Sequence, residues 1–340
     1  MRYIGGKALM LGHIIDTVEK ETKNVESVID IFSGSGIVGN AFKSKGYNVL
    51  LNDFLYFSYV IARGTVGIFE EPVFKNFDFD VIDYLNNISL ENTQYLLEKC
   101  FIYNNYSPNE NCERMYFQNE NAIKIDLIRM QIEDWNTAGL LSEDEYYYLL
   151  AALINAVPYV ANIAGVFGAY LKFWDKRTYN ILKLEKPSII TTNKNILCTN
   201  EDYTQILSEK YDLLYADPPY NSREYLPNYH ILETIARYDY PEIKGITGMR
   251  NYDTQKSVFC KKNTVHSAFE NLIKNCQSRY LLISYNNEGI ISTGDLSDIC
   301  KEYAVGNSFR LMEIDYRRYK NKIPNNKEGL KEQLYFLRRN

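Results

Sequence analysis

The feature that most constrains the fold is a strand that runs directly into a glycine-rich turn near the N-terminus. Residues 25–32 (VESVIDIF) form a β-branched apolar run, which is typical of a buried strand, and the turn 33–36 (SGSG) follows at once. Residues 37–45 then have the pattern of a helix, and residues 47–52 that of a second short strand. This strand, turn, helix and strand make a βαβ unit, which predicts a parallel sheet with right-handed crossovers.

The chain beyond this unit divides into a helical stretch and a second α/β stretch. The periodicity is mostly helical over residues 57–184, and the alternation of strands and helices resumes at Ile189. We therefore expect an α/β part at 1–56, a helical insertion at 57–184 and a second α/β part at 185–340. Within these parts the sequence predicts helices at 8–21, 122–135, 145–157, 202–210 and 229–238, a capping box from Ser142 to Glu145, strands at 195–199, 211–216 and 280–284, and a closing antiparallel pair at 310–319 and 331–339.

Composition narrows the class of protein. The chain has 340 residues, of which 46% are hydrophobic and 24% are charged, so it carries enough apolar material for a core. No apolar run approaches the roughly 18 residues of a membrane span, and residues 1–10 lack the apolar segment of a signal peptide. We expect a cytoplasmic protein with no membrane partner. The six cysteines are scattered and there are only three histidines, so we expect no metal and no disulfide framework.

The charge of the chain is distributed unevenly. A formal net charge of −5 argues mildly against nucleic-acid binding, because phosphates require Lys and Arg. Residues 301–340, however, contain ten basic and five acidic side chains, whereas residues 78–145 are acidic. A local basic surface is sufficient for DNA, so the average charge does not exclude it.

The strongest chemical signal is Asp217-Pro218-Pro219-Tyr220, which follows the apolar strand at 211–216. A carboxylate at the carboxyl end of a strand lies where open α/β sheets bind ligands. The two prolines remove two backbone donors and leave their carbonyls as acceptors. An exocyclic amino group has two hydrogens, and Asp217 and the Pro218 carbonyl can each accept one of them. Tyr220 offers an aromatic face at the same place. The two hydrogen bonds would strengthen as the amino nitrogen attacks a sulfonium methyl. The structural alternative is a Pro-Pro turn in which the aspartate caps a helix.

The second signal is the turn itself, Asp30-Ile31-Phe32-Ser33-Gly34-Ser35-Gly36. Its glycines permit a tight bend and close approach of a ligand, but their spacing is not that of the dinucleotide fingerprint. About 20 residues further on, Asp53 ends the next strand, where an acid can hold ribose hydroxyls. A plain βα turn, and a helix cap at Asp53, are the structural alternatives.

Together these segments resemble the amino-specific (N6-adenine) DNA methyltransferases of bacteria, of the D12 or Dam-like kind, with the motifs in alpha-class order. Residues 3–7 (YIGGK) resemble the N-terminal motif whose lysine lies near the methionine carboxylate of the cofactor, and residues 280–286 (YLLISYN) resemble the strand that supports the target-base pocket. Residues 161–166, 220–225 and 228–230 resemble one bacterial subgroup. The resemblance implies that the catalytic residues are Asp217, Pro218, Pro219 and Tyr220, and that the cofactor-binding residues are Tyr3, Lys7, Asp30, Phe32, Ser33, Gly34, Ser35, Gly36, Asp53, Asp202 and Asp217.

The resemblance also implies a fold and a reaction. The fold would be a Rossmann-like methyltransferase sheet interrupted at 57–184 by a helical target-recognition domain. The chain would transfer a methyl group from S-adenosylmethionine, without a metal, to N6 of an adenine flipped out of double-stranded DNA. It would serve as the modification enzyme of a bacterial or phage restriction-modification system, whose endonuclease acts on the same site without a stable complex. Methylation of cytosine N4 or of adenine in RNA, and an inactive DNA-binding relative, stay open.

Candidate DNA contacts are basic and aromatic residues at three places. Tyr170, Lys172, Lys176 and Arg177 belong to a stretch that mixes both kinds, with an aromatic core stripe ending in solvated charges as the alternative. Arg223 follows the catalytic turn and can contact phosphate or fill the gap left by a flipped base; a surface salt bridge is the alternative. Arg317 and Arg318 can hold phosphates, or form the solvated tip of a hairpin.

Overall fold

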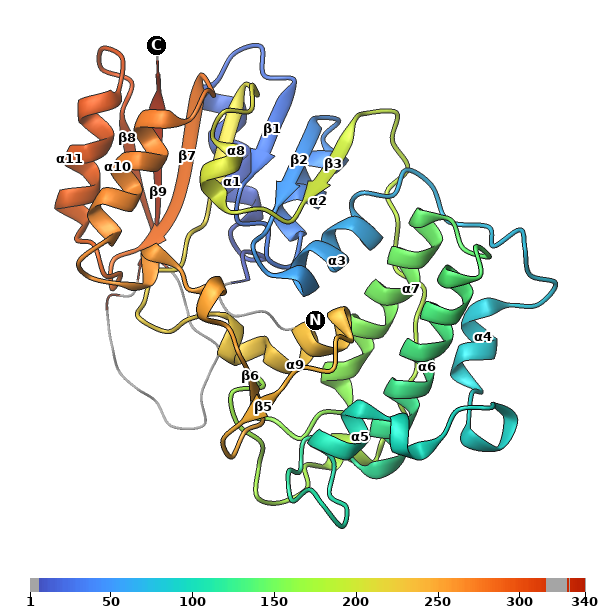
Figure 1. The fold of residues 1–340 in the computed structure, drawn as a ribbon. Coiled ribbons are helices and arrows are strands. Elements are labelled where there is room, and N and C mark those ends of the chain that lie inside the picture. The colour runs from blue at the N-terminus through green and yellow to red at the C-terminus, as the bar shows by residue number, and fades with distance from the viewer. Residues whose placement is uncertain (1–5, 316–328, 330, 340) are drawn as a thin grey trace.

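The computed structural model describes residues 6–315, 329 and 331–339, and they build an α/β fold around one large sheet (Figure 1). The strands lie in the order β3-β2-β1-β4-β7-β9-β8, and the first five are mutually parallel. β9 runs antiparallel to both β7 and β8, which confirms the expected closing pair and, with the parallel strands, the expected fold class. The strands are β1 (Ser27–Asp30), β2 (Asn48–Asn52), β3 (Ile196–Thr199), β4 (Leu213–Ala216), β7 (Tyr280–Asn286), β8 (Arg310–Asp315) and β9 (Lys331–Arg338).

Helices cover both faces of the sheet, which explains why the central strands β1, β2, β4 and β7 are almost fully buried. Successive side chains point to opposite faces, so Val28 and Leu213 pack with the helices of one face while Ile29 and Leu214 pack with those of the other. One face carries α1 (Leu11–Glu21), α2 (Ile37–Ser44) and part of α3 (Tyr56–Thr65), and the other carries α8 (Tyr203–Ile206), α10 (Val265–Asn275) and α11 (Thr293–Tyr303).

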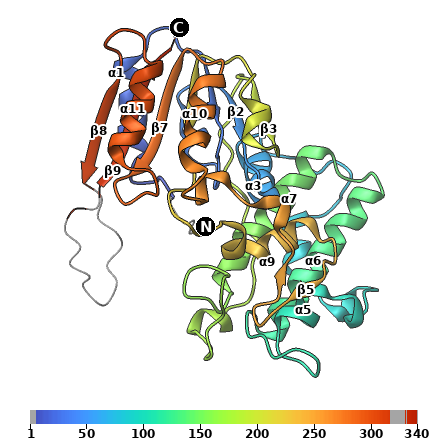
Figure 2. The same cartoon turned by 60° about the vertical axis from the view of Figure 1, so that its left-hand side comes forward.

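A second, mainly helical body lies beyond the carboxyl ends of the parallel strands (Figures 1 and 2). Its apolar cluster extends from Leu55 to Ala236, so it includes α9, the helix that follows the Asp-Pro-Pro-Tyr turn. The division of the chain at 57 and 184 stays a prediction, since packing links residues on both sides of the second boundary. The helices of this body are α3, α4 (Val81–Asn86), α5 (Phe101–Tyr106), α6 (Asn119–Thr137), α7 (Glu143–Ala156) and α9 (Leu226–Arg237). A small antiparallel hairpin of β5 (Ile243–Lys244) and β6 (Met249–Arg250) follows α9.

Local sequence signals hold in most places. The capping box is confirmed: the Ser142 hydroxyl accepts from the Glu145 amide, and the Glu145 carboxylate accepts from the Ser142 amide. The helix expected at 202–210 is shorter, because the Leu207 carbonyl accepts the Gln277 amide instead of continuing the helix. The helices α10 and α11 were not among the sequence predictions. Short 3₁₀ turns occur at Leu90–Asn92, Leu97–Lys99, Val157–Tyr159, Lys176–Tyr179, Asp253–Gln255 and Val258–Cys260.

Over the described part of the chain, every helix is too short or too polar to cross a membrane.

Candidate active site

A cavity of about 1020 Å³, counting its open mouth, lies at the carboxyl ends of β1, β2 and β4. Parallel strands end at the same edge of a sheet, so residues distant in sequence meet there. The residues of the sequence prediction that line it are Lys7, Asp30, Phe32, Ser33, Gly34, Ser35, Asp53, Asp202, Asp217 and Pro219.

The glycine-rich turn is held against the next strand by backbone hydrogen bonds. The Ser33 amide donates to the Asn52 carbonyl (2.9 Å), and the Gly34 amide donates to Oδ2 of Asp53 (2.7 Å). Gly34 and Gly36 have φ angles of +50° and +74°, a region that favours glycine. Gly36 is not among the described residues that line the cavity: it precedes α2, and a Cβ there would lie 3.2 Å from Cγ2 of Val66.

Asp53 is fixed in the cavity wall from three directions. Besides the Gly34 amide, its carboxylate accepts the Leu55 amide (2.9 Å), while its carbonyl accepts Nδ2 of Asn200 (2.7 Å). It therefore closes a turn ahead of α3 and is not the residue that precedes that helix, which is Leu55. Burial raises the pKa of Asp53 to about 6, although the two amide donors act to lower it.

Buried polar groups of the cavity wall lack side-chain partners. The hydroxyl of Ser33 and the carboxylate of Asp30 make no hydrogen bond with any described side chain, and only the backbone of Gly39 and Phe32 acts to lower the pKa of Asp30. Burial, followed by the charges of Asp217 and Asp53, raises the pKa of Asp30 well above its ordinary value. Because unpartnered buried polar groups are unfavourable, this wall is suited to a polar ligand that supplies the missing partners.

Lys7 joins two acids at one end of the cavity. Its Nζ lies 3.0 Å from Oδ1 of Asp217 and 3.3 Å from Oε2 of Glu332, and the lysine is buried. Burial acts to lower the pKa of Lys7, but the charges and hydrogen bonds of Asp217 and Glu332 raise it overall. Burial raises the pKa of Asp217 to about 6, and Lys7 only partly opposes this. Sequence reasoning missed Glu332, since only the register of β9 beside β7 brings it here.

Only part of the predicted catalytic turn, residues 217–220, lines the cavity. Asp217 and Pro219 line the cavity, whereas Pro218 and Tyr220 are not among its described lining residues. Pro218 is buried, and the ring of Tyr220 is half-buried against the apolar cluster beside β7. The Tyr220 carbonyl accepts the Ile290 amide (3.0 Å), which ties the turn to the segment after β7.

Aromatic rings form the far end of the cavity. The ring centroids of Phe32, Tyr203 and Phe259 lie 5.2–5.9 Å apart in pairs. Asp202, one of the residues expected to bind the cofactor, also lines the cavity, and its carboxylate accepts the Thr204 amide (2.9 Å) at the start of α8. Phe259 belongs to a segment, residues 255–259, that lines the cavity and carries no recognisable sequence motif.

The candidate DNA contacts differ in their surroundings. Lys172, Lys176 and Arg223 are exposed. Tyr170 is half-buried, with its ring centroid 5.1 Å from that of Tyr116, and Arg177 donates to the Ile163 carbonyl (2.7 Å) and pairs with Asp175. These two are engaged in holding their own loop. Tyr3, Arg317 and Arg318 lie outside the described residues.

Among the described residues, no three His, Cys, Asp or Glu side chains are grouped so that they could hold a metal ion.

Comparison with known proteins gives a consistent set of relatives. Residues 3–299 match the family described as D12 class N6 adenine-specific DNA methyltransferase. The chain is 41% identical to the type II methyltransferase M.FokI of Planomicrobium okeanokoites, over 100% of this chain and 53% of that protein. It is 40% identical to the modification methylase StsI of Streptococcus sanguinis, over 100% and 52%. It is 35% identical to the type II methyltransferase M.NlaIII of Neisseria lactamica, over 94% and 92%. The chain thus spans about half the length of the first two relatives and nearly all of the third.

Proposed function

Because the chain belongs to the D12 class N6 adenine-specific DNA methyltransferase family, we propose that it methylates N6 of adenine in double-stranded DNA. One observation carries the proposal. Asp217, the first residue of Asp-Pro-Pro-Tyr, lines the same cavity as the glycine-rich turn at Gly34 and the strand-end acid Asp53. An acceptor for an amino group and a place for a nucleoside-bearing cofactor therefore share one space.

Methyltransferases of this family take their methyl group from S-adenosylmethionine. The cavity fits this molecule, since two buried carboxylates, those of Asp30 and Asp53, and the partly exposed carboxylate of Asp217 face only one buried cation, Lys7, among the described lining residues. We propose that Asp53 holds ribose hydroxyls, that the Ser33–Ser35 turn and Asp30 hold the methionine end, and that Phe32 and Asp202 lie toward the adenine ring. When bound, the cofactor supplies a methyl group activated by a sulfonium centre.

The proposed part of the protein in the reaction is to bind and polarise the target base. Asp217 and the Pro218 carbonyl accept the two amino hydrogens of adenine, which increases electron density on N6. Tyr220 stacks on the extruded ring, offsetting part of the few kcal/mol that unstacking costs. Lys7, 3.0 Å from Asp217, favours the charged carboxylate that accepts these bonds.

We propose that the helical body reads the DNA sequence and that exposed cations hold the DNA backbone. Lys172, Lys176 and Arg223 are exposed and therefore accessible to phosphates. Arg317 and Arg318 are assigned the same role from sequence alone. Tyr170 and Arg177 are assigned to shaping the loop that presents Lys172, since their contacts are internal.

The relatives suggest a biological setting. The relatives M.FokI and M.NlaIII are named type II methyltransferases, and StsI is named a modification methylase. We propose that this chain likewise protects DNA in the cytoplasm of a bacterium or infected host, against an endonuclease that recognises the same site without forming a stable complex.

The test is transfer of a radiolabelled methyl group by the purified chain to DNA and to RNA of matched sequence, with wild type and Asp217→Ala side by side. We expect label in DNA with wild type alone, and N6-methyladenine after digestion to nucleosides. Label in N4-methylcytosine or in RNA would replace the proposed substrate. Cofactor binding without any transfer would identify a DNA-binding relative, and equal labelling by the variant would contradict the role of Asp217.

A further inference from the structure

We infer that Glu233 of α9 is a positioning residue that locks two walls of the cofactor cavity to the helix following the catalytic turn. The inference rests on the proposed function, because it concerns how the cavity is kept in register with Asp217. Glu233 is fully buried and lies on α9, outside the catalytic turn. It belongs to none of the sequence motifs of the site.

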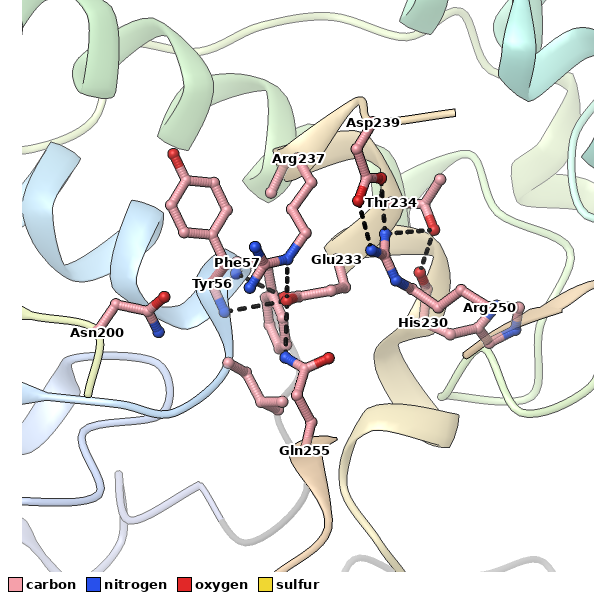
Figure 3. Close-up of polar contacts among 12 residues, drawn as sticks. Tyr56, Phe57, Asn200, His230, Glu233, Thr234, Arg237, Asp239, Arg250 and Gln255 are labelled. Atoms are coloured by element: carbon pink, nitrogen blue, oxygen red, sulfur yellow. Dashed lines mark hydrogen bonds and ion pairs between the residues drawn. The ribbon is translucent and has the colours of Figure 1, made fainter. Parts of the chain in front are cut away.

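The contacts of Glu233 come from three separate segments (Figure 3). Its Oε2 accepts the Phe57 amide (2.9 Å), and its Oε1 accepts the Tyr56 amide (3.2 Å). The same Oε1 accepts Nε of Arg237 (2.7 Å) and Nε2 of Gln255 (3.0 Å). Four donors match the number of lone pairs of a carboxylate, about four, and here three of the donors share Oε1.

The first wall is the segment that carries Asp53. Tyr56 and Phe57 open α3, where a helix offers its backbone N–H groups no acceptor of its own, and Glu233 accepts from both amides. A negative charge at this end also matches the helix dipole. At the opposite end, Nζ of Lys43 donates to the carbonyls of Val66 and Ile68. With α3 held at both ends, the turn from Asp53 to Leu55 has a fixed place in the cavity wall.

The second wall is the segment 255–259, which has no strand of the main sheet to hold it. Gln255 lines the cavity and donates to Glu233, and Phe259 at its other end belongs to the aromatic cluster. Through one side chain, α9 therefore holds the ribose side and the facing wall together.

The cation of this network is itself held in place. The guanidinium carbon of Arg237 lies 4.9 Å from the ring centroid of Tyr56, so the ion pair with Glu233 also presses on the first turn of α3. Asn200 lies on the other side of Tyr56 (Figure 3). Its Nδ2 donates to the Asp53 carbonyl. The arrangement would allow the cavity to keep its shape before any ligand enters.

The decisive variant is Glu233→Gln, which keeps the size of the side chain but offers one acceptor oxygen in place of two. We expect the dissociation constant for S-adenosylhomocysteine, measured by isothermal titration calorimetry, to rise about tenfold, the change that the loss of about one hydrogen bond in net terms produces. The KM for S-adenosylmethionine should rise by a similar factor, while kcat at saturating cofactor stays within about twofold. DNA affinity without cofactor should not change.

The matched control is Asp239→Asn, which removes a carboxylate from the neighbouring ion pair with Arg250 (Figure 3). Neither Asp239 nor Arg250 lines the cavity, so cofactor affinity should equal that of wild type. Equal weakening by both variants, or unchanged affinity in Glu233→Gln, would overturn the inference. If Glu233→Gln does not fold, Gln255→Met decides: its dissociation constant should rise about threefold, and no rise would overturn the inference. Failure of wild type itself to bind cofactor or transfer methyl would instead overturn the proposed function.

Discussion

Replacing Asp217 by asparagine should strongly lower turnover and at the same time stabilise the fold at neutral pH. In the folded protein, burial raises the pKa of Asp217 from 3.8 to about 6 even though Lys7 lies 3.0 Å away. At about 1.4 kcal/mol for each pKa unit, ionised Asp217 lowers the free energy of unfolding by roughly 3 kcal/mol above pH 6. Asparagine removes that ionisation and still offers Lys7 an acceptor oxygen.

The dependence on pH identifies the cause. A carboxyl group whose pKa is raised by folding binds its proton more tightly when folded, so its contribution to stability is present at low pH and is lost as pH rises from 3.8 to about 6. The variant should therefore exceed wild type by up to about 3 kcal/mol at pH 7.5, by about half of that at pH 5, and by little below pH 4. Urea denaturation at the three pH values measures the difference.

Turnover should move in the opposite direction. Loss of a single group that stabilises developing charge typically lowers kcat by about 10²–10³-fold, and we expect this range for the variant in methyl transfer to DNA. Cofactor affinity provides the control for an intact cavity. Turnover within tenfold of wild type would refute the role of Asp217 as acceptor. A variant less stable than wild type at pH 7.5 would refute the argument that its burial opposes folding.

Two further predictions concern Glu332, whose charge acts on Asp217, and the exposed lysines Lys172 and Lys176. Glu332→Gln should lower the pKa of Asp217, because the charge of Glu332 contributes to raising that pKa. The acid limb of the pH–rate profile should therefore move below about pH 6. An unchanged acid limb would contradict the electrostatic coupling of the two residues. Lys172→Ala and Lys176→Ala should each weaken DNA binding at all sequences and reduce the slope of log affinity against log salt by about one; an unchanged slope would mean that the lysine does not contact phosphate.

The parts of the site that sequence predicted are those that strand topology brings together. Gly34, Asp53 and Asp217 each follow a parallel strand, and the carboxyl ends of neighbouring parallel strands meet at one edge. Pattern and short motifs are therefore enough to predict that these residues share a cavity. The closing antiparallel pair is likewise predicted from the sequence, at 310–319 and 331–339, and β8 and β9 confirm it.

The parts that sequence missed depend on tertiary contacts. Glu332 reaches Lys7 only through the antiparallel register of β9, in which a shift by one residue would turn it to the other face. Glu233 lies on a helix whose pattern shows that one side is apolar, but not that α3 begins beside it. Arg177 looked like a phosphate contact from its composition alone, yet its guanidinium is satisfied within its own loop.

The acidity of the cavity has a consequence for cofactor binding. Burial raises the pKa values of Asp53 and Asp217 to about 6, and that of Asp30 is raised well above its ordinary value by burial and by the other two charges. A cation in this space stabilises the ionised forms, so binding should lower these pKa values and release protons. Titration calorimetry near pH 6 in buffers of different ionisation enthalpy measures the number released.

The charge of the ligand separates this effect from simple burial. S-adenosylmethionine carries a sulfonium charge that S-adenosylhomocysteine lacks, so the first should release more protons than the second near pH 6. The difference should be smaller in Asp217→Asn, which has one fewer group to titrate. Burial of a neutral ligand alone would raise the three pKa values further and take up protons instead. Proton uptake, or equal release by both ligands, would therefore show that the acids of this cavity do not face the charged centre of the cofactor.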